Sequence, residues 1–315
     1  MSLKKSGIVL RQGGGPPSAQ VIYTFIESQK ANHRVSAMCR ALKVSKSGFY
    51  GWRDRPPSAR AQADARLLEK IARIHKDSRE TYGAPRIHFE LRTLGVRCAR
   101  KRVARLMREA GLFGCGGRRR EAPTTLRPST ERTPPAPDLV ERNFTPGAPN
   151  RLWVADITYV RTWEGWLYFA FVLDAYSRKI VGWSMANNLK TDLVLDALNM
   201  AIYTRRPSPG LIHHSDRGSQ YSSAEFGGRL KEAGLLPSMG SVADAYDNSM
   251  AESFVSTLKR ELIHRGSWPS RQVVRTAVFE YIEAFYNLRR RHSALGHLSP
   301  AEYEEVRLRG GAAVA

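Results

Sequence analysis

The sequence holds 315 residues, with 50 lysines and arginines against 29 aspartates and glutamates, which gives a formal net charge of +21. A chain of this length accommodates two or three domains, and the positive excess favours a nucleic-acid partner. The three cysteines, Cys39, Cys98 and Cys115, form no CxxC pair, which excludes a disulfide scaffold and a zinc knuckle as the basis of the fold.

The positive charge is concentrated in the first half of the chain. Residues 1–149 contain 30 lysines and arginines against 12 acids, whereas residues 150–315 contain 20 against 17. We therefore expect the first half to bind phosphates and the second half to carry the chemistry. A basic surface that serves only solubility is the alternative.

No segment has the features of a membrane span or of a signal peptide. The apolar run at residues 167–173 is too short to cross a bilayer, and the first residues, MSLKKS, contain no apolar signal core. We expect a cytoplasmic protein that associates with the chromosome and has no membrane partner.

A helix-turn-helix is predicted near the N-terminus. Residues 1–20 carry glycine and proline without a hydrophobic period, so we expect them to be disordered. Residues 21–56 then predict a helix-turn-helix, with Lys46 and Arg53 on or near its second helix as DNA contacts. The alternative is a small three-helix domain with a purely structural role.

A second basic helical unit, similar to a helix-turn-helix, is predicted over residues 57–113. Its last helix, at residues 99–110, has an apolar inner face and a basic outer face. A solvated basic face is the alternative to the predicted phosphate contacts, which are Arg100, Lys101, Arg102, Arg105 and Arg108. Residues 114–150 are rich in proline and arginine with few large apolar side chains, which predicts a linker.

Residues 151–305 alternate predicted strands and helices. Three strands come first, most simply an antiparallel meander, and helix, strand, helix, strand and helix follow. This order indicates a ribonuclease-H-like α/β core, so we predict an α/β catalytic domain preceded by an all-α DNA-binding region. A last helix is expected at residues 270–290 and a flexible tail at residues 306–315. The predicted strands span residues 152–161, 167–174, 179–185, 210–214 and 235–239.

Three acids in this domain occupy positions where a charged carboxylate is unfavourable unless it has a partner. Asp156 interrupts a β-rich segment and Asp216 follows an apolar strand, where buried charge must be paired or bound to a metal. Glu252 is predicted on a helix. Two strand aspartates and one helix glutamate suit a pair of Mg²⁺ ions, which prefer carboxylate oxygens and can clamp the attacking and leaving oxygens of a phosphodiester. Strand-end capping is the alternative for each aspartate, and Asp247, the nearest rival to Glu252, is assigned to capping.

Four other polar residues of the domain have predicted roles. Asp174, at the end of a central strand, is expected to serve a turn with Ser177 and Arg178, and a place close to the metals is the alternative. Lys259 follows Glu252 by seven residues on the same helix face and is placed to contact a phosphate of the cleaved DNA end. Arg290 and Arg291 are expected to contact the DNA backbone, with a solvated charge run as the alternative.

Five phrases of the sequence identify a family. In them the chain resembles the DDE transposases of the insertion sequence 3 family, a branch of the retroviral-integrase superfamily, and the 35 residues between Asp216 and Glu252 match that family's acid spacing. The phrases are W-x-x-D-I-T-Y at 153–159, L-D-x-x-S-R-x-I-V-G-W at 173–183, H-S-D-R-G-S-Q-Y at 214–221, D-N-x-x-x-E-S-F at 247–254 and R-R-x-H-S-A-L-G at 289–296. The resemblance implies a ribonuclease-H-like core with Asp156, Asp216 and Glu252 as its catalytic, metal-binding acids.

We therefore expect a transposase that cleaves the 3′ ends of its own insertion sequence with two Mg²⁺ ions, or Mn²⁺ in their place, and transfers the strands during DNA integration. Its expected partners are the terminal inverted repeats, the target DNA and further copies of itself. The alternatives are a non-catalytic helix-turn-helix regulator of the element and a tyrosine recombinase, for which no Arg/His/Tyr set is evident.

The resemblance further implies a copy-out, paste-in route and a frameshift fusion to an upstream-frame protein, the OrfA type, that supplies a zipper. No segment of this sequence sustains the apolar heptads of a stable zipper. We expect this chain to resemble the downstream product and to bind DNA ends more weakly than such a fusion.

Overall fold

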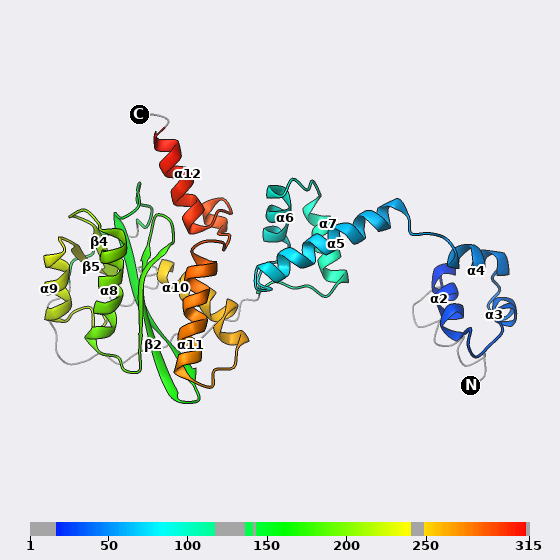
Figure 1. Ribbon diagram of the computed structural model, residues 1–315, viewed down its shortest axis with the longest axis horizontal. Coiled ribbons are helices and arrows are strands. Elements are labelled where there is room, and N and C mark those ends of the chain that lie inside the picture. The colour runs from blue at the N-terminus through cyan, green and yellow to red at the C-terminus, as the bar shows by residue number, and fades with distance from the viewer. Residues whose placement is uncertain (1–16, 117–135, 141–142, 241–248, 313–315) are drawn as a thin grey trace. The chain divides into compact units, whose positions relative to one another are not determined.

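The computed structural model describes residues 17–116, 136–140, 143–240 and 249–312 (Figure 1). The chain forms two compact units, residues 1–69 and residues 70–315. Most of the predicted N-terminal disordered segment and most of the predicted linker lie outside the described residues. None of the helices in the described ranges combines the length and the apolar character that a membrane crossing requires.

The first unit contains three short helices around a small apolar core. They are α2 (Ala19–Gln29), α3 (Val35–Ala41) and α4 (Lys46–Arg53). Each helix contributes one fully buried side chain, Ile26, Met38 and Phe49 respectively. The start of α4 is fixed by Ser45, whose hydroxyl accepts a hydrogen bond from the backbone N–H of Gly48 at 2.9 Å. The helix–turn–helix succession of α3 and α4 is the one that the sequence predicts.

Three further helices follow, and the last two pack on each other. They are α5 (Ala59–Asp77), which continues from the first unit into the second, α6 (Ala84–Thr93) and α7 (Arg100–Glu109). In α6 the buried side chains are Ile87 and Leu91, and in α7 they are Val103, Leu106 and Met107. The apolar inner face predicted for residues 99–110 is therefore confirmed.

A five-stranded mixed sheet forms the centre of the second unit (Figure 1). Its strands are β1 (Leu152–Thr162), β2 (Gly165–Asp174), β3 (Ile180–Ala186), β4 (Ile212–Ser215) and β5 (Leu236–Met239), in the order β3-β2-β1-β4-β5. The first three strands form the predicted antiparallel meander. β4 pairs parallel to β1, and β5 pairs parallel to β4, which is the strand arrangement of the predicted α/β core.

Helices cover both faces of this sheet, and alternate residues of β2 face the two helix layers. They are α8 (Thr191–Arg205) and α9 (Ala224–Glu232) on one face, and α10 (Ser249–Glu261) and α11 (Arg271–Phe279) on the other (Figure 1). Ala170 and Val172 belong to the core under α8 and α9. Phe169 and Phe171 instead pack against Phe254 of α10.

The C-terminal part of the chain differs from its prediction. Instead of one helix over residues 270–290, α11 passes into the π-helix η2 (Glu280–Tyr286), and a 3₁₀ turn, η3 (Ser293–Leu295), precedes the last helix, α12 (Pro300–Ala312). Residues 306–312, predicted as a flexible tail, continue α12. Helical hydrogen bonding extends further toward the C-terminus than composition indicates.

Gly182 sets how closely β3 approaches α8. A Cβ atom at this position would stand 2.2 Å from the carbonyl oxygen of Ala197 and 2.6 Å from the nitrogen of Ala201. Gly182→Ala is therefore expected to force the two elements apart and to lower the free energy of unfolding in urea by about 1–3 kcal/mol, the usual cost of overpacking.

The matched control is Gly228→Ala in α9, where an added Cβ meets nothing within 4 Å. Because alanine is the better helix former by about 1 kcal/mol, this variant should unfold at the same or a higher urea concentration. Wild-type stability of Gly182→Ala would contradict the close approach.

Candidate active site

Two of the predicted acids lie on adjacent strands. β1 and β4 run parallel, and Val154 pairs with His214. Continuing this register by two residues brings Asp216, one residue beyond β4, opposite Asp156. Asp156 also pairs with Phe171 of β2, which packs on Phe254 of α10, so its side chain points to the face of the sheet that α10 covers.

The third acid comes from α10. This helix packs on the sheet through Phe254, whose ring centroid lies 4.6 Å from that of Phe171. With Phe254 buried, Glu252 is exposed, and Lys259, seven residues further along the same side of the helix, is half-buried.

The charges of these residues act on one another. The pKa of Asp156 is raised to about 7, first because its carboxylate is buried and then because Asp216 and Glu252 are near. A hydrogen bond of 2.7 Å from the backbone N–H of Ile157 and the positive charge of Lys259 oppose this rise. The three predicted acids and Lys259 therefore share one electrostatic neighbourhood.

Asp216 lies in the loop that follows β4. Its side chain reaches solvent, yet the surrounding protein removes part of its hydration and raises its pKa. The backbone N–H of Gly218 donates a hydrogen bond to Asp216 Oδ1 at 3.1 Å, which opposes the rise and orients the carboxylate.

This donor set suits hard divalent cations. Part of the raised pKa of Asp156 reflects repulsion between carboxylates, which a bound cation would relieve. In the part of the chain that the structure describes, no three His, Cys, Asp or Glu side chains stand close enough to hold one ion together. Mg²⁺ commonly takes only one or two protein carboxylates and completes its shell with water and phosphate. The carboxylates that raise the pKa of Asp156 are those of Asp216 and Glu252; the rival Asp247 lies outside the described residues.

Asp174 has the turn role predicted for it. Its buried carboxylate accepts hydrogen bonds from the backbone N–H groups of Asn150 at 2.8 Å and Tyr176 at 3.0 Å. Arg205 lies 3.4 Å from the same carboxylate and 2.8 Å from that of Glu304. Asp174 therefore ties α8 and α12 to the end of β2.

The two histidines of β4 are buried and contact side chains in the interior of the domain. Burial lowers the pKa of His213 to about 4, so its ring is neutral, and it packs edge-on against Phe226 with centroids 5.3 Å apart. His214 is also buried, and its Nδ1 lies 2.9 Å from the hydroxyl of Ser238.

Two basic residues of α4 reach solvent. Arg53 forms a two-bond pair with Asp54 at 2.8 and 3.2 Å, and its guanidinium lies 4.7 Å from the ring centroid of Tyr50. The Lys46 ammonium lies 5.9 Å from the same ring. The two bonds to Asp54 leave the other N–H groups of the exposed Arg53 guanidinium for a phosphate.

The basic residues of α7 differ in accessibility. Arg100 and Lys101 are exposed, whereas Arg102 and Arg105 are half-buried. Arg105 pairs with Glu109 of the same helix at 2.9 Å, a contact that stabilises an exposed helix only slightly. Of these four side chains, Arg100 and Lys101 are the most accessible to DNA.

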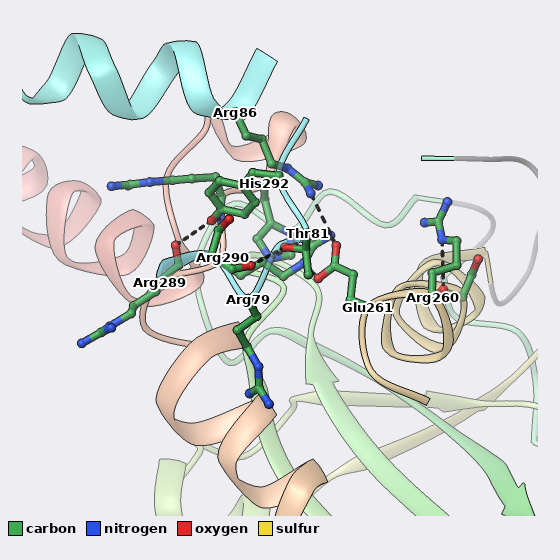
Figure 2. A network of polar contacts seen from close by, with 12 residues as sticks. Arg79, Thr81, Arg86, Arg260, Glu261, Arg289, Arg290 and His292 are labelled. Atoms are coloured by element: carbon green, nitrogen blue, oxygen red, sulfur yellow. Dashed lines mark hydrogen bonds and ion pairs between the residues drawn. The ribbon is translucent and has the colours of Figure 1, made fainter. Parts of the chain in front are cut away.

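The structure gives Arg290 a different role from the predicted DNA contact. Its side chain is 5% exposed, and its guanidinium binds both carboxylate oxygens of Glu261, at 2.7 and 2.8 Å (Figure 2). Glu261 also accepts a hydrogen bond from the hydroxyl of Tyr281 at 2.9 Å, and Arg86 lies 3.4 Å away. A charge buried this way is held by its partner, so Arg290 joins α10 to the C-terminal segment instead of facing a phosphate.

Arg291 is also engaged by carboxylates. It lies 2.7 Å from Glu90 of α6 and pairs with Glu302 of α12, while its backbone N–H donates to the hydroxyl of Tyr82 at 2.7 Å. The sequence alone does not indicate Glu261 and Glu90 as partners, because nothing local to the arginine run points to acids so far away along the chain.

Comparisons with known proteins match both the helical region and the α/β region of the chain. Models described as integrase core domain match residues 146–245 and 252–308, and an HTH-like domain matches residues 62–121. The chain is 42% identical to the transposase for insertion sequence element IS629 of Shigella sonnei, over 90% of this chain and 95% of that protein. It is 41% identical to transposase InsF for insertion sequence IS3A of Escherichia coli (strain K12), over 91% and 99%.

Two further similar proteins give less information about function. The insertion element IS600 uncharacterized 31 kDa protein of Shigella sonnei is 44% identical, over 85% of this chain and 97% of that protein. A solved HTLV-2 integrase catalytic core domain in complex with magnesium is 15% identical, covers 50% of this chain and 98% of its own, and superposes with a TM-score of 0.40.

The aligned transposases span nearly the whole chain, well beyond the catalytic core alone. The integrase core models include β1 with Asp156, the loop after β4 with Asp216, and α10 from Glu252 onward. The chain is therefore a transposase of the DDE type and belongs to the insertion sequence 3 family.

Proposed function

We propose that this transposase cleaves the 3′ ends of its own insertion sequence in a metal-dependent reaction and joins those ends to target DNA. The observation that carries the proposal is the electrostatic neighbourhood of Asp156, Asp216 and Glu252, in which the pKa of Asp156 is raised to about 7. Three carboxylates that repel one another beside the central strands of the sheet would be stabilised if they shared divalent cations.

The proposed cofactors are two Mg²⁺ ions, with Mn²⁺ as an acceptable substitute. Asp156 is common to both carboxylate pairs, with Asp216 in one and Glu252 in the other. Bound there, the ions supply charge neutralisation on the phosphate and acidify the attacking water or 3′-OH. The backbone N–H groups of Ile157 and Gly218 orient the two aspartates, at 2.7 and 3.1 Å.

Basic side chains are proposed to hold the DNA around this centre. Lys259, which acts on Asp156 from the Glu252 face of α10, would contact a phosphate next to the cleaved bond. The side chains proposed to contact the DNA backbone are Lys46, Arg53, Arg100, Lys101, Arg102 and Arg105.

The full reaction needs two ends at one place, so we propose that at least two copies of the chain assemble on the terminal repeats and the target. Fusion to an upstream-frame protein would strengthen that assembly. The proposed place of action is the chromosome in the cytoplasm.

The first prediction concerns the acids. Asp156→Asn, Asp216→Asn and Glu252→Gln should each slow end nicking and strand transfer by more than about 100-fold, because bound metal ions supply several kcal/mol of transition-state stabilisation. End binding, measured by gel shift without metal, should remain. Glu225→Gln, the same chemical change at an exposed position of α9, is the control, and normal nicking by any of the three variants would remove that residue from the site.

A second prediction concerns pH in the absence of metal. The folded-state pKa of Asp156, about 7, lies above its ordinary value of 3.8, so the folded state binds more protons than the unfolded state between these values. The contribution of Asp156 to stability is therefore present at low pH and lost as the pH rises through about 7. The free energy of urea unfolding should fall less in Asp156→Asn than in the wild type between about pH 5 and about pH 8. Identical pH dependence in both would argue against a crowded acid site.

A third prediction concerns α7. Each phosphate contact contributes about 0.9 to the slope of log affinity against log salt, so Arg100→Gln with Lys101→Gln should flatten the slope for end DNA by roughly 2. The control pair is Arg307→Gln with Arg309→Gln, both exposed on α12, which should leave the slope unchanged. Equal slopes for wild type and the α7 pair would show that this face points away from DNA.

A further inference from the structure

The hydroxyl of Tyr221 is buried, and the packing of its ring does not account for the presence of a hydroxyl group there. Tyr221 is 4% exposed, and its ring packs edge-on against Phe226 with centroids 5.4 Å apart. Among the described residues, its phenolic oxygen has no hydrogen-bond partner. An unpaired buried hydroxyl destabilises the folded state, and a phenylalanine would fill the same space without that penalty.

The loop after β4 folds so that Tyr221 lies beside Asp216. The backbone N–H of Tyr221 donates to the carbonyl of Gly218 at 3.1 Å, and the N–H of Gly218 donates to Asp216 Oδ1 at 3.1 Å. A Cβ on Gly218 would stand 3.0 Å from that same oxygen and 3.6 Å from Cδ2 of Tyr221. The carboxylate of Asp216 and the ring of Tyr221 therefore flank one glycine.

The phenol is kept in its donor form. Burial, and then the negative charges of Asp216 and Asp156, raise the pKa of Tyr221 well above its ordinary value. A protonated phenol next to carboxylates has a hydrogen to donate, and the acids have lone pairs to accept it.

We propose that Tyr221 is a positioning residue of the active site, whose O–H donates to the Asp216 carboxylate, directly or through one ordered water, when the site holds metal. This inference rests on the metal site proposed above. Donation from Tyr221 fixes the orientation of a metal-holding carboxylate, and loss of such a support commonly weakens metal affinity or activity about 10- to 100-fold.

A purely structural role makes the opposite predictions. Trp153 Nε1 and His213 Nε2 are also buried without a partner among the described residues, and the His213 ring centroid lies 6.2 Å from that of Tyr221. A water that bridged these three groups would stabilise the fold and leave metal binding alone. Tyr221→Phe would then lower the unfolding midpoint and preserve the metal response.

The test compares the full-length wild type with Tyr221→Phe and with Tyr203→Phe, which removes the same hydroxyl from a side chain that is 80% exposed. The thermal midpoint is measured without metal and during a Mn²⁺ titration, since binding to the folded state raises the midpoint. The Mn²⁺ concentration for half-maximal end nicking is measured in parallel.

For Tyr221→Phe we expect a metal-free midpoint equal to or above that of the wild type, and a Mn²⁺ requirement about 10-fold higher or more in both titrations. Tyr203→Phe should behave as the wild type. A wild-type Mn²⁺ response in Tyr221→Phe would overturn the role proposed for Tyr221 and leave the metal site intact. A wild-type chain that shows no Mn²⁺ response would overturn the metal site, and the role of Tyr221 with it.

Discussion

The buried ion pair between Glu261 and Arg290 holds the helix on which the third acid stands. Glu252 lies in the first turn of α10, and Glu261 is its last residue. Burial alone would raise the pKa of Glu261, but the hydrogen bonds and charge of Arg290 lower it, so the carboxylate stays ionised. Removing one partner of such a pair costs about 3–5 kcal/mol, because the other is left as an uncompensated charge. The position of Glu252 relative to the sheet therefore depends on a contact nine residues away from it along the same helix.

The same group of contacts attaches α6 to the catalytic domain. Arg86, in the first turn of α6, approaches Glu261 of α10 (Figure 2). Glu90, in the middle of α6, binds Arg291 of the C-terminal segment. Since α7 packs on α6, the helix proposed to bind end DNA and the helix that carries Glu252 belong to one packed unit. Arg290 and Arg291, whose sequence resembles a phosphate-binding run, instead hold the parts of this packed unit together.

Local patterns predicted those features that depend on local chemistry. Asp156 stands out in the sequence because a buried carboxylate in a β-rich run is unfavourable unless it is paired or binds a metal. The meander is predicted from three closely spaced strands. The π-helix was missed, since the spacing of Tyr281, Ile282, Phe285 and Tyr286 fits a buried α-helical face equally well. The role of Arg290 was not predicted, because the sequence of an arginine run is the same whether its side chains contact solvent, phosphate or a distant carboxylate. Contacts between residues far apart in the sequence depend on the fold, and the local sequence does not reveal them.

We propose that Asp156, Asp216 and Glu252, which come from a strand, a loop and a helix, hold metal at one place. Fe²⁺ bound there in place of Mg²⁺ and treated with ascorbate and peroxide would release hydroxyl radicals that cut the nearby backbone. If the three acids share the metal, cuts are expected close to all three, suppressed together by excess Mg²⁺ and lost in Asp156→Asn. Cuts at only one of the three segments, or a pattern that Asp156→Asn leaves unchanged, would contradict it.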